Sequence, residues 1–255
     1  MDAHPDPGPD GPSSRFDRRE LHDLLCSLSG ELCRPLASLR MGFDLMLGGG
    51  APAFSAAQSG HVATMRGLCD DMLRLTRSYL DYAEVIRASR PPALGAYSLG
   101  ALVREAERTF GGAAREKGLD WSAEAVDGDA IVTTDAARCQ QILAALVSNA
   151  VKFTPPGGRV RVVGKLGDGS WSLAVTDNGP GMAPDEVHRV FEPFYRLVRD
   201  EHSADGNGLG LPIARELAAQ LGGRIELESR EGEGVAAVAV FPLDPAAAGP
   251  APDRH

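Results

Sequence analysis

The chain has 255 residues, of which 43% are hydrophobic and 24% charged, and its formal net charge is −9 at pH 7. These proportions are ordinary for a soluble globular protein with one large domain or two smaller ones. The negative charge argues against general binding to nucleic acid or to an anionic membrane. No apolar run approaches the roughly eighteen residues of a membrane-spanning helix, so we expect no membrane span.

Both ends of the chain are rich in proline and lack hydrophobic patterning. Residues 1–14 contain no apolar segment of the kind that a secretion signal needs, and residues 245–255 are mostly alanine, proline and glycine. We therefore expect two disordered tails and a cytoplasmic protein. The four cysteines are Cys26, Cys33, Cys69 and Cys139. None forms a Cys-x-x-Cys pair, so we expect small core residues in a reducing compartment rather than a zinc site.

Residues 15–90 carry two runs of apolar residues spaced three or four apart, the pattern of amphipathic helices. The first run is Leu21, Leu25, Leu28, Leu32, Leu36, Leu39, Phe43 and Met46, and the second is Val62, Met65, Cys69, Met72, Thr76, Tyr79, Ala83 and Ile86. The glycines and proline of residues 48–52 separate the runs, so we expect a helical hairpin. Two helices bury little apolar surface, and the spacing is close to that of a bundle. We therefore expect a homodimer, in which a second copy completes a four-helix bundle.

Pro91 and Pro92 end the hairpin, and we expect a linker over residues 91–96. From residue 97 to residue 244 the pattern becomes a mixture of helices and strands. The expected helices are 99–110, 135–153 (with Asp135 as N-cap) and 209–221, and the expected strands are 119–126, 130–133, 159–166, 170–176, 224–229 and 235–241. Strands grouped in this way, with helices on one face, predict an α+β sandwich.

Four short motifs in this second region carry polar or glycine-rich chemistry. They are Ser148–Pro155 (SNAVKFTP), Asp177–Met182 (DNGPGM), Phe191–Arg196 (FEPFYR) and Gly206–Leu211 (GNGLGL). The last motif opens a helix, where exposed backbone N–H groups suit phosphates, although such a cluster is as often only a turn.

The polar residues of these motifs allow both a functional and a structural interpretation. Asp177 could accept a hydrogen bond from an adenine amino group, with Gly179 and Gly181 letting the ring approach, or it could be a solvated carboxylate. Asn149 offers the oxygen that Mg²⁺ prefers, or is an ordinary polar helix residue. Lys152 lies one turn further on the same helix face and could reach a phosphate.

Taken in order, the four motifs resemble the N, G1, F and G2 boxes of the ATP-binding domain of sensor histidine kinases, over about residues 97–243. The resemblance implies a Bergerat-type sandwich that binds Mg-ATP under a lid over residues 182–205. It implies Asn149 as the magnesium ligand, Asp177 as the adenine anchor and the glycine-rich motif as the phosphate loop. The ATP-binding residues that it implies are Asn149, Lys152, Asp177, Gly179, Gly181, Gly206, Gly208, Leu209 and Gly210. Two histidines of this stretch, His188 and His202, are expected to be exposed to solvent.

Two places depart from the family pattern. Ala145 stands four residues before Asn149, where the family often has a second asparagine and related ATPases have a glutamate base. We therefore do not expect hydrolysis by the route of those ATPases. Val235 and Ala236 stand where a threonine usually helps to hold adenine, which allows weaker affinity without implying loss of binding.

The hairpin resembles the dimerisation and phosphoacceptor domain of the same family, whose motif reads Ser-His-Glu-[Leu/Phe]-Arg-[Thr/Asn]-Pro-Leu. When the sequences are aligned on Glu31, Pro35 and Leu36, Gly30 occupies the position of the phosphoacceptor histidine. The apolar stripe lies two positions away on either side, so we expect Gly30 to face away from it. Glycine has no nucleophile, and autophosphorylation at this position is chemically impossible.

The residues around Gly30 also depart from what the usual activities need. Glu31 matches the acidic neighbour that helps to activate the histidine, and here it has nothing to activate. Arg34 stands where the phosphatase activity of the family relies on threonine or asparagine. Ser27 and Ser29 are close in sequence, but we expect them to be ordinary helix residues, and we do not expect His22 or His61 to serve as the acceptor.

We thus expect a histidine-kinase-like protein of two-component signal transduction that binds Mg-ATP and acts as a regulatory pseudokinase. Its partners would be a second copy of the chain, and a response regulator or another histidine kinase. One alternative is an active kinase that phosphorylates a histidine of a partner or an atypical acceptor. A serine kinase of the anti-sigma-factor type shares the ATP domain but does not need the hairpin. Ala145 and the short chain oppose a DNA-repair or chaperone ATPase of the same superfamily.

Overall fold

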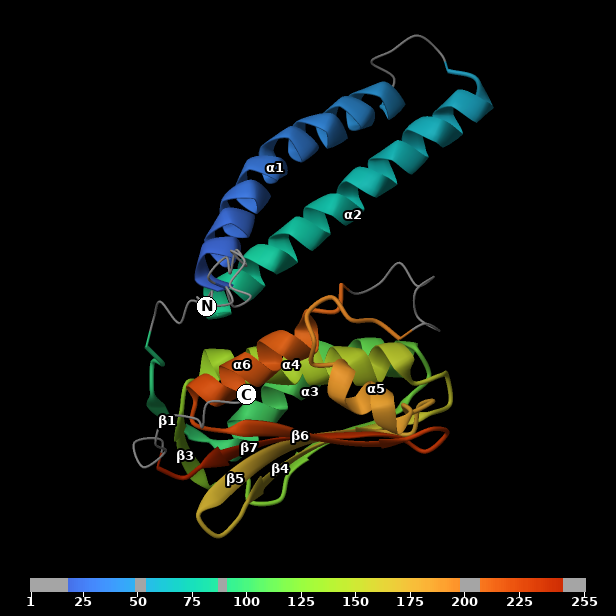
Figure 1. Ribbon diagram of the computed structural model, residues 1–255. Helices are drawn as coiled ribbons and strands as arrows, with labels where there is room; N and C mark the ends of the chain where they lie inside the picture. Colours follow the sequence, from blue (N-terminus) through green and yellow to red (C-terminus); the bar gives the residue numbers. More distant parts are fainter. Residues whose placement is uncertain (1–17, 49–53, 87–90, 198–206, 245–255) are drawn as a thin grey trace, which may run out of the picture. The chain divides into compact units, whose positions relative to one another are not determined.

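The computed structural model describes residues 18–48, 54–86, 91–197 and 207–244 (Figure 1). The chain forms two compact units, residues 1–83 and residues 84–255. Among the described helices, none combines the length and hydrophobicity that are needed to cross a membrane.

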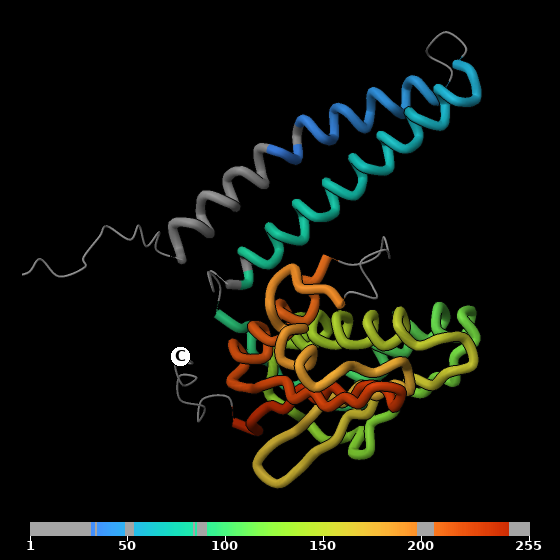
Figure 2. The backbone as a smooth tube through the Cα atoms, turned by 45° about the vertical axis from the view of Figure 1, so that its right-hand side comes forward, coloured from blue at the N-terminus to red at the C-terminus, as the bar shows by residue number. Residues whose placement is uncertain are grey.

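The first unit is a helical hairpin, as expected from the two apolar runs. Its helices are α1 (Arg18–Leu47) and α2 (Ala56–Ile86), which run side by side in Figures 1 and 2. A small apolar cluster of Leu36, Cys69 and Leu73 holds them together. Ion pairs link the helices at Arg40–Asp70 and Arg66–Asp44. These exposed pairs add little stability, so the cluster is the main contact between the two helices.

The hairpin leaves much of its apolar surface uncovered within one chain. Ten large apolar side chains of α1 and α2 have exposed fractions between 36% and 65%. They are Leu32, Leu39, Met41, Leu45, Met46, Leu47, Met65, Leu68, Met72 and Leu75. Several belong to the two apolar runs, so the stripes predicted from sequence are only partly buried in a single chain.

The second unit is an α+β sandwich built on a five-stranded sheet, as expected. The strand order is β2-β4-β5-β7-β6, where β2 pairs with β4 in parallel and the other neighbours are antiparallel. The strands are β2 (Asp120–Ala125), β4 (Arg159–Leu166), β5 (Ser170–Asp177), β6 (Arg224–Arg230) and β7 (Gly234–Pro242). A separate two-stranded sheet pairs β1 (Gly95–Ser98) with β3 (Ile131–Thr134).

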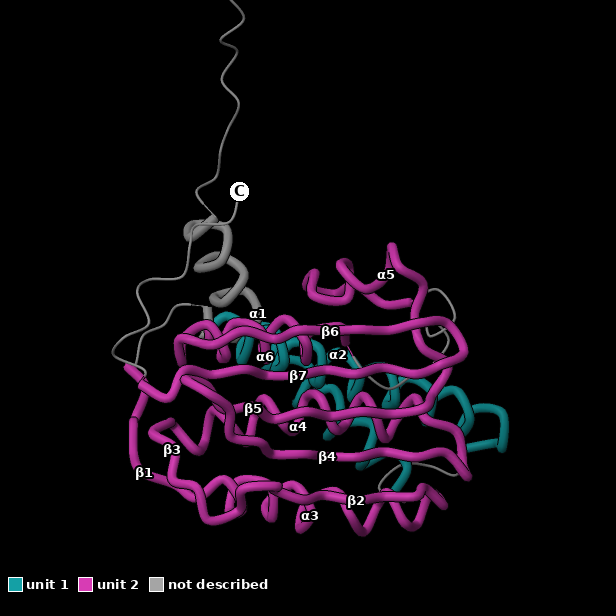
Figure 3. The backbone as a smooth tube through the Cα atoms, turned by 90° about the horizontal axis from the view of Figure 1, so that it is seen from below, with its two compact units in different colours: residues 1–83 teal, residues 84–255 magenta. Residues whose placement is uncertain are grey.

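Three helices, α3 (Leu99–Glu116), α4 (Ala136–Phe153) and α6 (Gly210–Gln220), cover one face of the five-stranded sheet (Figures 1 and 3). Alternate residues of the central strands point into this layer, and Trp171 of β5 stacks on its register partner Phe241 of β7. Ile142 and Leu143 of α4 are fully buried in the same core. Burial of each such side chain stabilises the fold by roughly 1.5–3 kcal/mol.

Three features differ from the sequence expectations. Strand β1 begins at Gly95, inside the stretch expected to be a linker. A short helix, α5 (Pro184–Arg189), lies within the expected lid. Helix α3 continues to residue 116, beyond the expected end at residue 110. The Glu107 carboxylate, whose Oε1 lies 2.6 Å from the position of a Cβ at Gly111, accepts hydrogen bonds from Arg115 and from Trp121 of β2, and these bonds hold the extended end of α3 against the neighbouring strand.

The cysteines with described side chains fit the expectation of small core residues. Cys69 and Cys139 are buried, Cys33 is half-buried, and all three are free thiols. Among the described residues, no group of three or more histidine, cysteine, aspartate or glutamate side chains could hold a metal ion. The side chain of Cys26 lies outside the described part of the chain.

Candidate functional site

Helix α4 supplies one wall of a cavity in the second unit. The helix begins after Asp135, whose Oδ1 accepts a hydrogen bond from Arg138 N at 3.2 Å, as expected for an N-cap. Its apolar face is buried against the sheet. The adjoining face carries Ala145, Ser148, Asn149 and Lys152, all of which line the cavity. The helical spacing therefore brings Asn149 and Lys152 together, as predicted.

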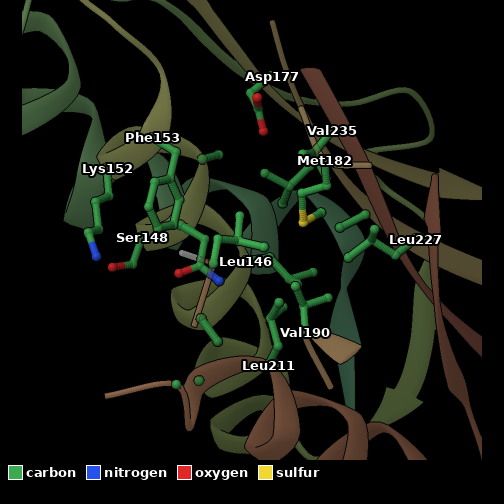
Figure 4. Close-up of a pocket in the computed structure, with 18 of the residues that line it drawn as sticks. Leu146, Ser148, Lys152, Phe153, Asp177, Met182, Val190, Leu211, Leu227 and Val235 are labelled. Atoms are coloured by element: carbon green, nitrogen blue, oxygen red, sulfur yellow. The ribbon is translucent and has the colours of Figure 1, made fainter. Parts of the chain in front are cut away.

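The cavity has a volume of about 290 Å³ and mostly apolar walls. Figure 4 shows Leu146, Met182, Val190, Leu227 and Val235 around it. The polar side chains that line it are Ser148, Asn149, Lys152, Asp177, Tyr195, Arg196 and Asn207. An apolar pocket with a few polar groups is typical of small-molecule and cofactor sites.

Asp177 lies at the end of β5, and its carboxylate points toward Met182 and Val235 in Figure 4. Its Oδ1 accepts a hydrogen bond from Gly179 N at 2.8 Å, and Val235 N also donates to the carboxylate. Burial raises the pKa of Asp177 above its ordinary value, and these two N–H groups offset part of that rise. The cavity thus contains a partly desolvated carboxylate that can accept a further hydrogen bond.

Gly181 lines the cavity, but its own backbone packing explains why the position needs glycine. Its φ is +63°, and an added Cβ would lie 1.9 Å from the carbonyl oxygen of Arg230. The turn between β6 and β7 therefore excludes a side chain here, whatever approaches from the cavity. Gly179 is absent from the cavity lining, and its N–H group holds the Asp177 carboxylate.

The glycine-rich motif packs against the FEPFYR motif. Gly208 has a φ of +70°, and an added Cβ would lie 2.6 Å from the carbonyl oxygen of Tyr195. Phe194 N donates a hydrogen bond to Gly208 O at 3.1 Å. Gly208 and Gly210 line the cavity, and Gly210 begins α6, so backbone N–H groups of a helix start are available there. Leu209 is buried away from the cavity lining, and Gly206 lies outside the described residues.

Several lining residues were not singled out from the sequence. Ser148, Tyr195, Arg196 and Asn207 belong to the quoted motifs, but the motif spacing does not show which side chains face a cavity. Val235 lines the cavity, so one of the two positions where the family usually has a threonine does lie at the site. His188 is exposed, as expected, and His202 lies outside the described residues.

The region around Gly30 is described only as backbone. Helix α1 continues through Gly30 and Pro35 without a break. The side-chain surroundings of Gly30, Glu31 and Arg34 lie outside the described part of the chain. The expected outward orientation of Gly30 therefore stays a prediction.

Comparison with known proteins matches both the fold and the motifs. Residues 134–245 match the family model of histidine kinase-, DNA gyrase B-, and HSP90-like ATPases. The chain is 29% identical over 224 residues to a sensor-like histidine kinase of Rhizobium meliloti, covering 87% of this chain and 42% of that protein. It is 30% identical over 221 residues to histidine protein kinase DivJ of Caulobacter vibrioides, covering 86% of this chain and 37% of that protein. The chain thus spans less than half the length of either relative.

Solved structures agree with these relatives. The crystal structure of full-length ShkA in complex with AMPPNP has a TM-score of 0.69 at 30% identity, covering 91% of this chain and 47% of that chain. Histidine kinase ThkA, solved in complex with response regulator protein TrrA, shares the fold with a TM-score of 0.62 at 22% identity, covering 91% of this chain and 65% of that chain. With its four ordered motifs and its sandwich fold, the chain belongs to the sensor histidine kinase family.

Proposed function

We propose that the cavity of the second unit binds Mg-ATP and that the protein acts in two-component signalling. The observation that carries this proposal is the distribution of polar groups in an apolar cavity. Asp177 is a half-buried carboxylate at one place, and Lys152 and Asn149 lie together on α4 at another. An adenine amino group would donate to Asp177, and Lys152 and the N–H groups at the start of α6 would bind phosphates. The AMPPNP complex of ShkA supports the same occupant.

We propose Asn149 as the protein ligand of Mg²⁺. Nucleotide-bound Mg²⁺ takes most of its roughly six ligands from phosphates and water, and needs only one or two from the protein. The amide oxygen of Asn149 fits this requirement, since it lies in the cavity one turn before Lys152. Ala145 contributes only a methyl group at the preceding turn, so no carboxylate base for water activation stands there.

We propose that Gly30 removes the usual phosphoacceptor and that the protein is a regulatory pseudokinase. A helix residue without a side chain cannot carry a phosphoryl group. A second candidate function is transfer of phosphate to a histidine of a partner or to an atypical acceptor. The retained set of Asn149, Lys152 and Asp177 in one cavity favours that alternative over a pure scaffold. In both cases a response regulator or another histidine kinase is the proposed partner.

The exposed apolar side chains of the hairpin support the proposed homodimer. Ten large apolar residues of the two helices are exposed, and exposed apolar surface on a helix pair is typical of a protein–protein interaction site. A second copy of the hairpin would cover them by forming a four-helix bundle. This arrangement also fits the near-heptad spacing of the two apolar runs.

The test measures nucleotide binding and labelling separately. Calorimetry with Mg-AMPPNP should show one site per chain, and Asp177→Ala should weaken binding strongly, because the adenine amino group then loses its proposed acceptor. Gly30→His, assayed with γ-labelled ATP for acid-labile phosphate, tests whether only the acceptor is missing, with Gly30→Ala as the matched control. Label on Gly30→His and none on Gly30→Ala supports the pseudokinase. Label on an added partner by the unmodified protein supports the alternative, and absence of nucleotide binding contradicts both.

A further inference from the structure

The turn that follows α3 and the turn that follows α4 are joined by backbone hydrogen bonds. Gly157 N donates to Gly118 O at 3.0 Å, and Asp120 N donates to Gly158 O at 2.8 Å. The strands that leave these turns, β2 and β4, pair in parallel. Lys117, the residue before Gly118, is therefore held at a fixed place beside the end of α4.

Lys117 caps the carboxyl end of α4 with its side chain. The last four carbonyl groups of an α-helix have no partner within the helix. Lys117 Nζ donates to two of them, Val151 O and Lys152 O, each at 2.7 Å. An ammonium group at this place also interacts favourably with the negative end of the helix dipole. All three residues are half-buried, so water would replace a lost ammonium group only in part.

The carbonyl groups that Lys117 binds belong to the part of α4 that presents Asn149 and Lys152 to the cavity. Both of these side chains line the cavity, and so does Phe153, whose ring centroid lies 4.5 Å from Lys152 Nζ. Figure 4 shows Lys152 beside Phe153, with Asp177 on a different part of the wall. Two lysines therefore act at one helix end, where Lys117 binds the backbone and the side chain of Lys152 forms part of the cavity wall.

The carboxylate on the other part of the wall is held by different contacts. Asp177 accepts hydrogen bonds from Gly179 N and Val235 N, and neither residue belongs to α4. Loss of the Lys117 cap would therefore loosen the residues proposed to bind phosphate and Mg²⁺. The same loss would leave the proposed acceptor of the adenine amino group in place.

We propose that Lys117 is a positioning residue for the phosphate groups and the Mg²⁺ of the bound nucleotide. It acts by fixing the last turn of α4, and it is not one of the residues that line the cavity. This inference rests on the proposed function, because the cavity must bind Mg-ATP for the effect to be expressed. The expected signature is a loss of affinity that is confined to ligands with phosphate groups.

Two variants of Lys117 and one matched control test this role. Lys117→Met removes the ammonium group and keeps most of the aliphatic stem, and Lys117→Gln keeps an N–H donor without the charge. The control is Gln140→Met, because Gln140 Nε2 donates to Leu102 O at 3.0 Å and so also links α4 to α3. Gln140 lies in the first half of α4 and does not line the cavity.

The first measurement compares the affinities of the full chain for Mg-AMPPNP and for adenosine, which has the same base and no phosphate group. We expect Lys117→Met to weaken Mg-AMPPNP binding by at least about 10-fold, close to the contribution of one hydrogen bond to a charged group, and Lys117→Gln to weaken it less. The affinity for adenosine should change by less than about 2-fold in both variants. In Gln140→Met both affinities should change by less than about 2-fold.

The second measurement is labelling with an amine-reactive reagent, because the chain has only three lysines, Lys117, Lys152 and Lys165. Lys165 is exposed on β4 and serves as the internal standard. We expect saturating Mg-AMPPNP to slow the labelling of Lys152 in the unmodified protein and in Gln140→Met. At the same occupancy this protection should be smaller in Lys117→Met, because the turn no longer holds Lys152 against the phosphate groups.

Three outcomes overturn the proposal. Unchanged Mg-AMPPNP affinity and unchanged protection of Lys152 in Lys117→Met refute the positioning role and leave the proposed function intact. Equal weakening of Mg-AMPPNP and adenosine, or the same weakening in Gln140→Met at an equal loss of stability in urea unfolding, shows that Lys117 is merely structural. An unmodified protein that binds no nucleotide refutes the proposed function and this inference together.

Discussion

Replacing Gly181 with alanine tests the contact between the DNGPGM motif and the turn that joins β6 to β7. The left-handed backbone at φ +63° costs an alanine about 1–2 kcal/mol. The new Cβ would also lie 1.9 Å from the carbonyl oxygen of Arg230, so the turn must move by more than about 1 Å. Such overpacking costs a further 1–3 kcal/mol or so. We therefore expect Gly181→Ala to lower the free energy of unfolding of the second unit by about 2–5 kcal/mol.

Two other glycines separate these contributions. Gly157 has a φ of +83° with no atom within 4 Å of an added Cβ, so Gly157→Ala should show the backbone cost alone, about 1–2 kcal/mol. Gly112 lies in α3 with equally open surroundings, and Gly112→Ala should stabilise by about 0.5–1 kcal/mol. Urea unfolding followed by tryptophan fluorescence reports the second unit, because the chain has two tryptophans, Trp121 and Trp171, and both belong to it. Equal losses for Gly181→Ala and Gly157→Ala would refute the packing argument.

Three further predictions concern a carboxylate, a thiol and the hairpin. Burial raises the pKa of Asp177, so ADP affinity should begin to fall at a higher pH than for an ordinary aspartate, because the ionised carboxylate is a stronger acceptor for an adenine amino group than the protonated form. Asp177→Asn should lack this fall, and pH profiles of the same shape for both proteins would contradict the prediction. The free energy of unfolding depends on pH in the opposite direction. The folded state holds the Asp177 proton more tightly than the unfolded chain, so protonation adds stability as the pH falls through the raised pKa. Cys139 is fully buried, and burial raises its pKa to about 11. At pH 8 it should therefore be alkylated far more slowly than half-buried Cys33. Equal alkylation rates of the two thiols, measured by peptide mass spectrometry, would refute this. Leu68→Lys, at a side chain that is 59% exposed, should weaken the proposed dimer in sedimentation without changing the urea unfolding of the second unit, and an unchanged sedimentation profile would argue against the bundle.

The sequence predicted the sandwich well where the pattern was long or strongly periodic. Strand β4 has the expected bounds, and α4 begins directly after its expected N-cap, Asp135. Short elements were missed for physical reasons. Strand β1 has four residues and exists because β3, about 35 residues further along the chain, pairs with it. The extension of α3 past Gly111 depends on Glu107 reaching Trp121 in a neighbouring strand, a contact that no local pattern reveals.

The sequence predicted which motifs form the site, but not which of their residues line the cavity. The order of the four motifs brought Asn149, Lys152 and Asp177 to one cavity. Spacing could not show that Gly179 and Leu209 lie outside the cavity lining, because that depends on which face of each loop packs inward. Nor could spacing show that Arg230 approaches Gly181, since the two residues meet only after the sheet has formed.

The two outer strands of the five-stranded sheet determine how the molecule can associate with others. Strand β6 exposes Arg224, Glu226, Glu228 and Arg230 in alternation along its length. On β2, the other edge, Asp120 and Glu124 are exposed, and Asp120 forms an ion pair with Arg159. Charged edge strands discourage the addition of a further strand from another chain. The second unit is thereby protected from growth by sheet extension, which leaves the apolar helices of the hairpin as the surface for the proposed self-association.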